Sequence, residues 1–416
     1  MPGLETWWRD TEALHRYVVD LVHDELARLR PGSLPPARPW DSALGLVDST
    51  GLACDSLELL NLASAVAEAV QMHRAGVEDY LLARRTIGDW VAIVAAGLER
   101  FSDELTFRTS GTTAEPTARL HELVRLAQEV EELAPLFPGR LRILSAAPAH
   151  HIYGFLFSIL LPQRLAAPVI DIRARSPTSV GAMLRDGDLV IGHPAFWTAF
   201  VRAGVSSTSD VIGVTSTGPC PADVARAVTD RGVTRLVEVY GSSETAGLAV
   251  REHPEAAFRL FSYWSRGRDD STLARTLADG SVEAAAAPDH LAWCDDRCFR
   301  VEGRRDHAVQ VGGVNVSPEL VAQRLREHPM VKDAAVRLMR PEEGARLKAF
   351  IVPVQRPPDV VTLRRDLAAW CDARFSVAER PKAFSLGPEI PRGALGKPAD
   401  WSVFEETGPG EETAGG

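Results

Sequence analysis

The chain has few lysines, few cysteines and no hydrophobic run long enough to cross a bilayer. Its 46 Lys and Arg side chains face 56 Asp and Glu side chains, which gives a net charge of -10. This acidic balance argues against nucleic acid or an anionic membrane surface as the main partner. The most apolar runs, 90–98 and 152–161, are too short for a transmembrane helix, and the sequence does not open on a leader pattern. We therefore expect no membrane span and a cytoplasmic location.

The five cysteines are odd in number and lack the paired spacing of metal ligands, so a disulfide framework and a zinc site are both disfavoured. Lysine is rarer still, because arginine supplies nearly all the basic side chains. The lysines are Lys332, Lys348, Lys382 and Lys397. Composition bias and chance are the simpler explanation for a lysine at any one of these positions, with a specific chemical need as the alternative. With 416 residues, the chain is long enough for two or three domains and for an enzyme.

The first hundred residues show helical periodicity. Apolar residues over 11–29 fall on one helical face, and a Pro/Gly-rich stretch follows. Asp55 and Glu58 have the spacing of a capping box at the start of a second helix, and a third helix is predicted from Thr86 to about Leu98. Residues 1–100 are therefore predicted to form a helical bundle.

From about residue 105, short apolar strands alternate with helical stretches, and the pattern is typical of an α/β fold with a largely parallel sheet. The strands are predicted at 141–147, 167–172, 188–193, 210–216 and 234–240, with helices at 119–135 and 221–230 among them. The core is expected to span 101–303. Residues 304–405 are predicted to be a small α+β domain in which Ser317 caps a helix. The apolar-poor tail 406–416 is predicted to be disordered.

A loop rich in hydroxyl groups is the first candidate for chemistry. Gly111 frees backbone N–H groups to turn inward, and hydroxyl donors flank it, which suits a cradle for phosphate oxygens. Its hydroxyl-bearing residues are Thr109, Ser110, Thr112 and Thr113. An ordinary Ser/Thr-rich turn is the alternative when the loop is taken alone.

Four further segments follow that loop in order. They are His150-His151-Ile-Tyr-Gly, Tyr240-Gly-Ser-Ser-Glu244, Gly303-Arg-Arg-Asp306 and Pro391-Arg-Gly-Ala-Leu-Gly-Lys397. This ordered series resembles the adenylate-forming superfamily of acyl-CoA synthetases and aryl-acid ligases, over roughly residues 105–400. The resemblance implies an α/β ligase core with a small mobile C-terminal domain, and ATP and Mg²⁺ as cofactors.

By this resemblance, the loop at 109–116 closes over the β- and γ-phosphates of ATP. Two positions depart from the family pattern, since Ala114 stands at a usual glycine and Thr117 replaces the lysine that normally follows the proline. The loss of that cation puts in doubt how strongly the loop holds pyrophosphate.

The segment at 240 follows a predicted strand, and α/β sheets bind ligands at the carboxyl ends of their strands. The resemblance implies that Tyr240 stacks on adenine, Ser243 contacts the α-phosphate beside Gly241, and Glu244 holds Mg²⁺, a hard ion that prefers oxygen ligands. A carboxylate at a helix start is the alternative role for Glu244. Gly218 falls in the adenine-side loop, which is one residue shorter than usual.

Several assignments toward the C-terminus follow from the same alignment of motifs. Asp289 stands where the family carboxylate accepts the ribose hydroxyls, with Asp295 and Asp296 as rivals, and Arg304 is expected to reach the ribose. Asp306 falls at the hinge about which the small domain rotates between two half-reactions. Gly312 and Gly313 follow where family members line a channel for the pantetheine arm; they are suited to a close backbone approach.

Lys397 and His151 are the implied catalytic side chains beside Glu244. An ammonium between a carboxylate oxygen and the α-phosphate neutralises charge as the two join, and lysine suits that role better than arginine. His151 resembles the gate residue of hydroxycinnamate and related aryl-acid ligases. A buried structural histidine is the alternative.

The helical region carries a second resemblance, to an acyl carrier protein, in which Ser56 would bear phosphopantetheine. A carrier-like fold with a packing role only is the alternative. The favoured reaction is ATP-dependent activation of a small aryl acid such as 4-hydroxybenzoate, followed by transfer to a pantetheine thiol of an acyl carrier protein or CoA. Fatty acids as substrates, or a degenerate protein that binds ATP or docks a carrier, remain open.

Overall fold

The computed structural model describes residues 3–30, 35, 39–108, 118–304, 308–340, 343–355, 359–391, 401 and 403. These residues divide into two compact units, one ending at Gly303 and the other beginning at Arg304. The predicted phosphate loop, Asp306, Lys397, the side chain of Arg304 and the tail 406–416 lie outside the described residues. No helix within the described ranges combines the length and the apolar character that a bilayer span requires.

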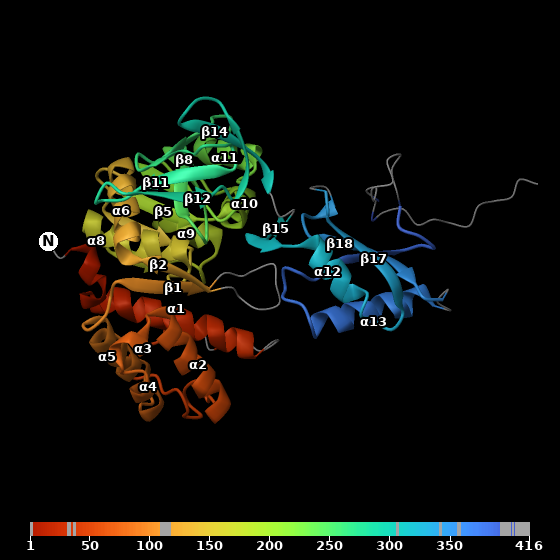
Figure 1. Cartoon of the computed structure of the whole chain (residues 1–416), viewed down its shortest axis with the longest axis horizontal. Coiled ribbons are helices and arrows are strands. Elements are labelled where there is room, and N and C mark those ends of the chain that lie inside the picture. The colour runs from red at the N-terminus through yellow and green to blue at the C-terminus, as the bar shows by residue number, and fades with distance from the viewer. Residues whose placement is uncertain are drawn as a thin grey trace, which may run out of the picture. The chain divides into compact units, whose positions relative to one another are not determined.

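The first unit opens with short and long helices that gather beside a two-stranded hairpin (Figure 1). They are η1 (Leu4–Arg9), α1 (Thr11–Leu29), α2 (Ser56–Ala69), α3 (Met72–Ala75), α4 (Asp79–Ala83) and α5 (Ile87–Leu98), and the hairpin is β1 (Glu104–Arg108) with β2 (Ala118–Glu122). The capping box before α2 is present, because Asp55 accepts from the Glu58 N–H at 2.8 Å and Glu58 accepts from the Asp55 N–H at 3.0 Å. Thr86 caps α5. The helix starts therefore lie where the sequence predicted them.

A nine-stranded sheet forms the centre of the first unit, in the order β13-β14-β9-β8-β7-β6-β5-β3-β4. Its strands are β3 (Arg142–Ser145), β4 (Val169–Asp171), β5 (Asp188–Gly192), β6 (Val211–Thr215), β7 (Arg235–Ser242), β8 (Ala246–Arg251), β9 (Phe258–Leu260), β13 (Asp289–Trp293) and β14 (Cys298–Arg304). The strands β4, β3, β5, β6 and β7 run parallel, and β8 and β9 continue the sheet antiparallel. The predicted α/β fold class is confirmed.

Both faces of the parallel strands are covered, which explains why their sequences are almost wholly apolar. Alternate residues of each strand point to opposite faces. Leu144, Val190 and Leu236 join a core with the helices α9, α10 and α11, whereas Ile143 and Val237 face the larger core. The covering helices are α6 (Leu123–Leu133), η2 (Ala134–Leu136), α7 (Ile152–Phe155), η3 (Leu156–Leu160), α8 (Leu161–Leu165), α9 (Pro177–Met183), α10 (Pro194–Arg202) and α11 (Ala222–Asp230).

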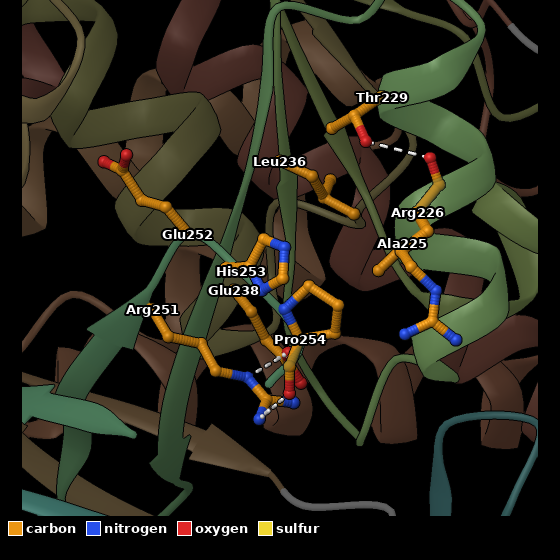
Figure 2. Close-up of a pocket in the computed structure, with 9 residues that line it drawn as sticks. All are labelled: Ala225, Arg226, Thr229, Leu236, Glu238, Arg251, Glu252, His253 and Pro254. Carbon is orange, nitrogen blue, oxygen red and sulfur yellow. Dashed lines mark hydrogen bonds and ion pairs between the residues drawn. The ribbon is translucent and has the colours of Figure 1, made fainter. Parts of the chain in front are cut away.

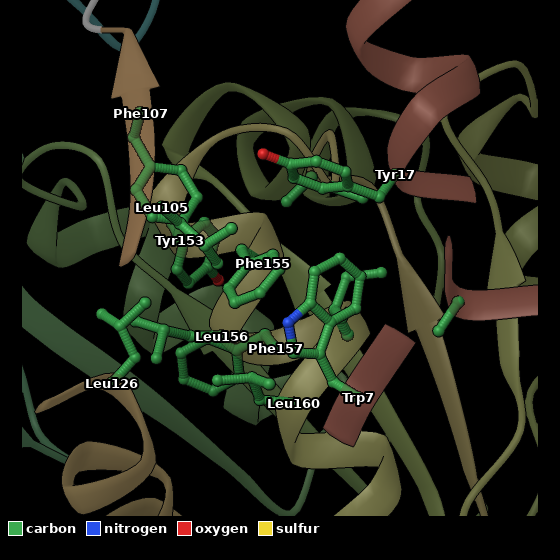
Figure 3. Packing of buried hydrophobic residues seen from close by; sticks show 14 of the residues in the cluster. Trp7, Tyr17, Leu105, Phe107, Leu126, Tyr153, Phe155, Leu156, Phe157 and Leu160 are labelled. Atoms are coloured by element: carbon green, nitrogen blue, oxygen red, sulfur yellow. The ribbon is translucent and has the colours of Figure 1, made fainter. Parts of the chain in front are cut away.

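The larger core joins the N-terminal helices to the sheet. Figure 3 shows Trp7 and Tyr17 packed around Phe155, with ring centroids 5.0 and 5.6 Å from it, and Phe107 of β1 lies 5.3 Å from the same ring. These edge-on aromatic contacts add to the large apolar area that the rings bury. Residues of α1 and α2 therefore share one core with the sheet, while Ser56 lies exposed at the first turn of α2.

The predicted helix at 119–135 is wrong at its start. Residues 118–122 form β2, and α6 begins at Leu123. Pairing with β1 in the register Arg108↔Ala118 to Glu104↔Glu122 fixes this segment as a strand, a partnership between segments that helical periodicity does not reveal. A small sheet of β10 (Trp264–Arg266), β11 (Thr272–Thr276) and β12 (Val282–Ala286) completes the unit.

The second unit is an α+β fold around its own core. It contains the hairpin β15 (Val309–Val311) and β16 (Val314–Val316), the helices α12 (Pro318–Leu325) and α13 (Val360–Asp372), and the sheet β17 (Val331–Leu338), β18 (Leu347–Pro353) and β19 (Ala383–Leu386). Ser317 caps α12 by accepting from the Leu320 N–H, as predicted. Lys348 is buried, and its ammonium donates to the Glu343 carboxylate at 2.8 Å and to the Trp401 carbonyl. One of the rare lysines therefore has a structural reason.

Candidate functional site

The carboxyl ends of three parallel strands lead into the segments that carry the predicted site. His151 follows β3, Gly218 follows β6 and Tyr240 lies near the end of β7. Carboxyl ends of parallel strands meet at one edge of a sheet, which is where α/β folds bind ligands. The Tyr153 hydroxyl donates to the Gly192 carbonyl at 2.9 Å and joins the histidine segment to the end of β5. The fold thus gathers segments that lie far apart in the sequence.

Tyr240 and Asp289, both predicted to contact the nucleoside, touch each other. The Tyr240 hydroxyl donates to Asp289 Oδ2 at 2.8 Å, and the Asp289 carboxylate is buried at the start of β13. The Tyr240 ring packs against Phe258 and Phe299, with centroids 5.4 Å away in each case. Because these contacts fix the ring and orient the carboxylate, the pair presents one aromatic surface and one acceptor side by side.

Asp295 and Asp296, the alternatives to Asp289 as the ribose carboxylate, differ from it in their contacts and exposure. Asp295 Oδ1 accepts from the backbone N–H groups of Arg297 and Cys298 at 2.7 and 2.6 Å, so its carboxylate closes the turn between β13 and β14. These hydrogen bonds lower the pKa of Asp295. Asp296 is exposed. Among the three aspartates that the sequence offered, Asp289 is the one in contact with Tyr240.

The loop predicted to lie beside adenine is held to β7. The Ser216 hydroxyl donates to the Val239 carbonyl at 2.9 Å, and Thr217 has a φ of 73°, so the chain turns sharply just before Gly218. Gly241 cannot carry a side chain, because a Cβ there would lie 2.1 Å from the Ala246 carbonyl oxygen. The turn after β7 therefore depends on glycine for a close approach of two backbone segments.

A pocket lined by residues of α11, β7 and the end of β8 contains none of the predicted site residues. Figure 2 shows Glu238 and Arg251 paired in it; their shortest separation is 2.7 Å, and both side chains are largely buried. Glu238 also accepts from the Cys220 N–H at 3.2 Å, and burial raises the pKa of Glu238. The pair anchors the end of the segment that carries Gly218, so a structural role accounts for it.

Ser243 and Glu244 form the turn between β7 and β8. The Ser242 hydroxyl accepts from the Glu244 N–H at 3.2 Å, and the Glu244 carboxylate, 51% exposed, pairs with Arg119 at 3.0 Å. His121 Nε2 lies 2.7 Å from the Ser243 carbonyl oxygen and must donate, since a carbonyl only accepts. Burial lowers the pKa of His121, which keeps this ring neutral. The half-exposed Glu244 carboxylate is an oxygen ligand of the kind that Mg²⁺ prefers.

The rings of His150 and His151 lie side by side just before α7, with centroids 4.2 Å apart and planes tilted by 46°. Burial, with a smaller effect from His150, lowers the pKa of His151 to about 3. The ring is therefore neutral at ordinary pH and can offer an N–H to a carboxylate without carrying charge. Gly154 in this segment permits a close approach, because a Cβ there would lie 1.8 Å from the Pro148 carbonyl oxygen.

The N-terminal helix α1 braces the histidine segment, a role that the sequence did not suggest. The buried Asp20 carboxylate accepts from the Ala149 N–H at 2.6 Å and from Arg173 Nη2 at 2.7 Å. One turn later, Asp24 Oδ2 lies 3.4 Å from His150 Nε2. Acidic residues at i and i+4 on an otherwise apolar helix face are the signal that could have found this contact.

A pocket lies beside the two histidines. It is lined by Leu21, Asp24 and Glu25 of α1, Ala65, Glu68 and Ala69 of α2, Thr106 and Arg108 of β1, and His150 and His151. Arg108 directly precedes the predicted phosphate loop and pairs with both Glu25 and Glu68. The N-terminal helices therefore form one wall of this pocket beside His150 and His151.

His193 was not predicted as a site residue, and the predicted glycines Gly312 and Gly313 have a structural role of their own. His193, at the carboxyl end of β5, accepts from the Phe196 N–H at 3.3 Å and caps α10; a histidine after a strand and before a proline was the available signal. Gly312 and Gly313 have φ values of 60° and 86° and form the turn between β15 and β16. That turn by itself requires glycine.

Comparison with known proteins gives two matching family models. Residues 107–262 match the model described as AMP-binding enzyme, and residues 321–397 match the model of the AMP-binding enzyme C-terminal domain. The chain is 37% identical over 383 residues to the 4-coumarate--CoA ligase of Halorhodospira halophila, covering 92% of this chain and 97% of that protein. It is 36% identical over 411 residues to the 4-coumarate--CoA ligase of Cereibacter sphaeroides, covering 94% and 97%.

Solved structures share the fold. The amide bond synthetase McbA from Marinactinospora thermotolerans superposes with a TM-score of 0.60 at 19% identity and covers 92% of both chains. The o-succinylbenzoate CoA synthetase from Bacillus subtilis gives a TM-score of 0.56 at 18% identity, over 71% of this chain and 67% of that one. The first of these likenesses in fold extends over nearly the whole chain.

Proposed function

Since this chain belongs to the family of AMP-binding enzymes and is an AMP-forming acid–thiol ligase that uses ATP and Mg²⁺, we propose that its substrate is a small hydroxyaryl acid and its thiol acceptor is CoA. The observation that carries the choice of acid is the identity of 37% to a protein named 4-coumarate--CoA ligase over almost its full length. The choice between 4-coumarate and the shorter 4-hydroxybenzoate is left to the experiment below.

The first half-reaction joins the acid to the α-phosphorus of ATP. A carboxylate oxygen attacks that phosphorus and pyrophosphate leaves, so an acyl-adenylate forms. Tyr240 and Asp289 are proposed to hold the adenosine, because they offer an aromatic ring and a buried carboxylate side by side. The Tyr240 hydroxyl and Asp289 Oδ2 lie 2.8 Å apart. Glu244 would hold Mg²⁺, which when bound would neutralise phosphate charge. Positioning and charge neutralisation supply most of the rate.

His151 and Lys397 are proposed to act on the acid itself. The neutral His151 ring donates an N–H to the carboxylate, and the Lys397 ammonium neutralises charge between the carboxylate and the α-phosphate. In the second half-reaction, a thiolate attacks the acyl carbonyl and AMP leaves with the electrons of the broken mixed-anhydride bond. No protein nucleophile is required in either step.

CoA is favoured over a carrier protein because the similar curated proteins are named CoA ligases. The N-terminal helices are proposed to be a wall of the acid pocket and not a carrier, since they share a core with the sheet. Intact mass after incubation with CoA and a phosphopantetheinyl transferase tests Ser56. An unchanged mass supports the proposal that these helices line the acid pocket. A mass increase of one phosphopantetheine would support the alternative, that they act as an acyl carrier.

Thioester formation tests the proposed substrates. The enzyme is incubated with Mg-ATP, CoA and one acid at a time: 4-coumarate, 4-hydroxybenzoate, benzoate, or a medium-chain fatty acid. Mass spectrometry then detects the acyl-CoA. We expect the hydroxyaryl acids to give the highest kcat/KM. A preference for the fatty acid, or a product seen only with a phosphopantetheinylated carrier protein, would overturn the respective choice of acid or acceptor.

A further inference from the structure

Arg119 places a cation at the turn that carries the proposed magnesium ligand. On β2, residues 119 and 121 share one face of the strand, and they contact two successive residues of the turn. His121 Nε2 reaches the Ser243 carbonyl at 2.7 Å, and the Arg119 guanidinium reaches the Glu244 carboxylate at 3.0 Å. The antiparallel register Phe107↔Arg119 holds the strand in place. The position of Arg119 therefore follows from the hairpin and not from one flexible contact.

The neighbouring guanidinium groups are engaged elsewhere. Arg125 pairs with Glu122 at 2.8 Å and with Glu283, and Arg275 donates to Gln128 at 3.0 Å and to the Arg125 carbonyl. The Arg119 side chain is 42% exposed at the carboxyl edge of the sheet. Of these three cations, Arg119 is the one directed at the Glu244 turn.

A triphosphate needs positive charge, and guanidinium is well suited to phosphate oxygens because it donates several hydrogen bonds from a planar fork. The chain has threonine at position 117, where the adenylate-forming pattern has lysine. Arg119 follows two residues later. The charge that the hydroxyl-rich loop lacks is thus present on the strand that continues it.

We propose that Arg119 binds the β- and γ-phosphates of ATP and takes the place of the absent lysine. Without nucleotide, Arg119 neutralises Glu244. When Mg²⁺ occupies the Glu244 carboxylate, Arg119 exchanges that partner for phosphate oxygens, so the turn never holds an uncompensated charge. This inference rests on the use of ATP and not on the identity of the acid.

Nucleotide affinity without any acid tests the role. Isothermal titration with Mg-ATP, Mg-pyrophosphate and AMP is carried out on the full chain and on Arg119→Gln. A lost charge-assisted hydrogen bond corresponds to about a tenfold to hundredfold weaker affinity for ATP and pyrophosphate, whereas AMP, which lacks those phosphates, binds as before. Arg125→Gln, which removes a nearby guanidinium from other partners, leaves all three affinities within about twofold.

Rescue by a second substitution completes the test. Thr117→Lys in the Arg119→Gln background restores most of the ATP affinity, and Arg119→Lys retains part of it. Equal losses for ATP and AMP would show a structural role only, and an unchanged ATP affinity would overturn the inference outright. If Arg119→Gln fails to fold, Arg119→Lys takes its place in the test. The proposal predicts that the ratio of ATP affinity to AMP affinity is lower in Arg119→Lys than in wild type. The titration contains no acid, so failure of the substrate proposal leaves its result intact.

Discussion

Two side chains from distant parts of the sequence, Tyr240 and Asp289, meet through one hydrogen bond at the edge of the sheet. Tyr240→Phe keeps the ring against Phe258 and Phe299 and removes only the hydroxyl. A hydrogen bond of this kind contributes about 0.5–1.5 kcal/mol, so the KM for ATP should rise by about twofold to tenfold while the KM for the acid stays unchanged. Tyr80→Phe, at an exposed tyrosine, is the matched control. Equal changes in both KM values would argue against a nucleoside role.

His151 links the site to pH. In the unfolded chain its pKa is near the ordinary 6.5, and burial lowers it to about 3 in the folded protein. Between these values the unfolded state binds a proton that the folded state does not, so this residue makes the free energy of unfolding decrease as pH falls from 6.5 toward 3. His151→Asn should make that decrease shallower, by at most about 1.4 kcal/mol per pH unit.

Urea unfolding at pH 7 and pH 4.5 measures the effect of His151. The quantity compared is the change in the free energy of unfolding between the two pH values, in wild type and in the variant. The absolute stability is not compared, because the substitution changes it as well. Equal changes in wild type and variant would show that His151 is protonated in the folded protein at pH 4.5.

Sequence patterns named candidate site residues but not the contacts that these residues make. Tyr240, Asp289 and Glu244 could be named because their motifs are local, with each residue following a strand or standing at a fixed spacing. The partners Arg119 and Asp20 were not named. Each contacts a residue more than a hundred positions away, and such contacts depend on strand order and helix docking, which spacing along the chain does not contain.

Among the elements, α1 has the clearest consequence for the site. Asp20→Asn keeps the side-chain shape but replaces a carboxylate that holds both the Ala149 N–H and Arg173. Leaving Arg173 beside a neutral amide loosens the segment that precedes His151. We expect the KM for the acid to rise by about tenfold, with the KM for ATP within about twofold, since a lost charge-assisted hydrogen bond costs about 1.5–3 kcal/mol.

Steady-state kinetics with each substrate varied in turn measures this split for Asp20→Asn. Glu99→Gln, which removes an exposed carboxylate paired with Arg9, serves as the control. A lower melting temperature without any rise in the KM for the acid would confine Asp20 to stabilising the fold.

Elements with strong periodicity were predictable, and elements defined by pairing were not. The helix α1 and the five parallel strands carry their signal locally, as 3.6-residue periodicity or continuous apolar runs. β2 escaped, because its residues look helical until β1 pairs with them. The strands that continue the sheet beyond β7, which are β8, β9, β14 and β13, also escaped, because they are short and alternate weakly.

At the scale of the whole molecule, the two compact units meet in sequence at Gly303 and Arg304. Gly303 has a φ of 146°, a conformation that favours glycine. We propose that the second unit turns about Asp306 between adenylation and thioester formation. Asp306→Pro should then leave acid-dependent pyrophosphate exchange within about threefold and slow acyl-CoA formation at least tenfold, because proline fixes φ.

Single-turnover assays of the two half-reactions test the hinge. The second assay starts from enzyme that already holds acyl-adenylate, so that only transfer to CoA is timed. Equal slowing of both half-reactions would indicate general damage and not a hinge.

Acid-dependent exchange of pyrophosphate into ATP tests the central claim most directly, since it reports adenylation without any thiol. The wild-type chain should exchange with hydroxyaryl acids and Mg²⁺, and Lys397→Ala should lose at least about a hundredfold of that rate, because it removes the cation proposed to neutralise the forming bond. Absence of exchange with every aryl and alkyl acid in the panel would contradict the account.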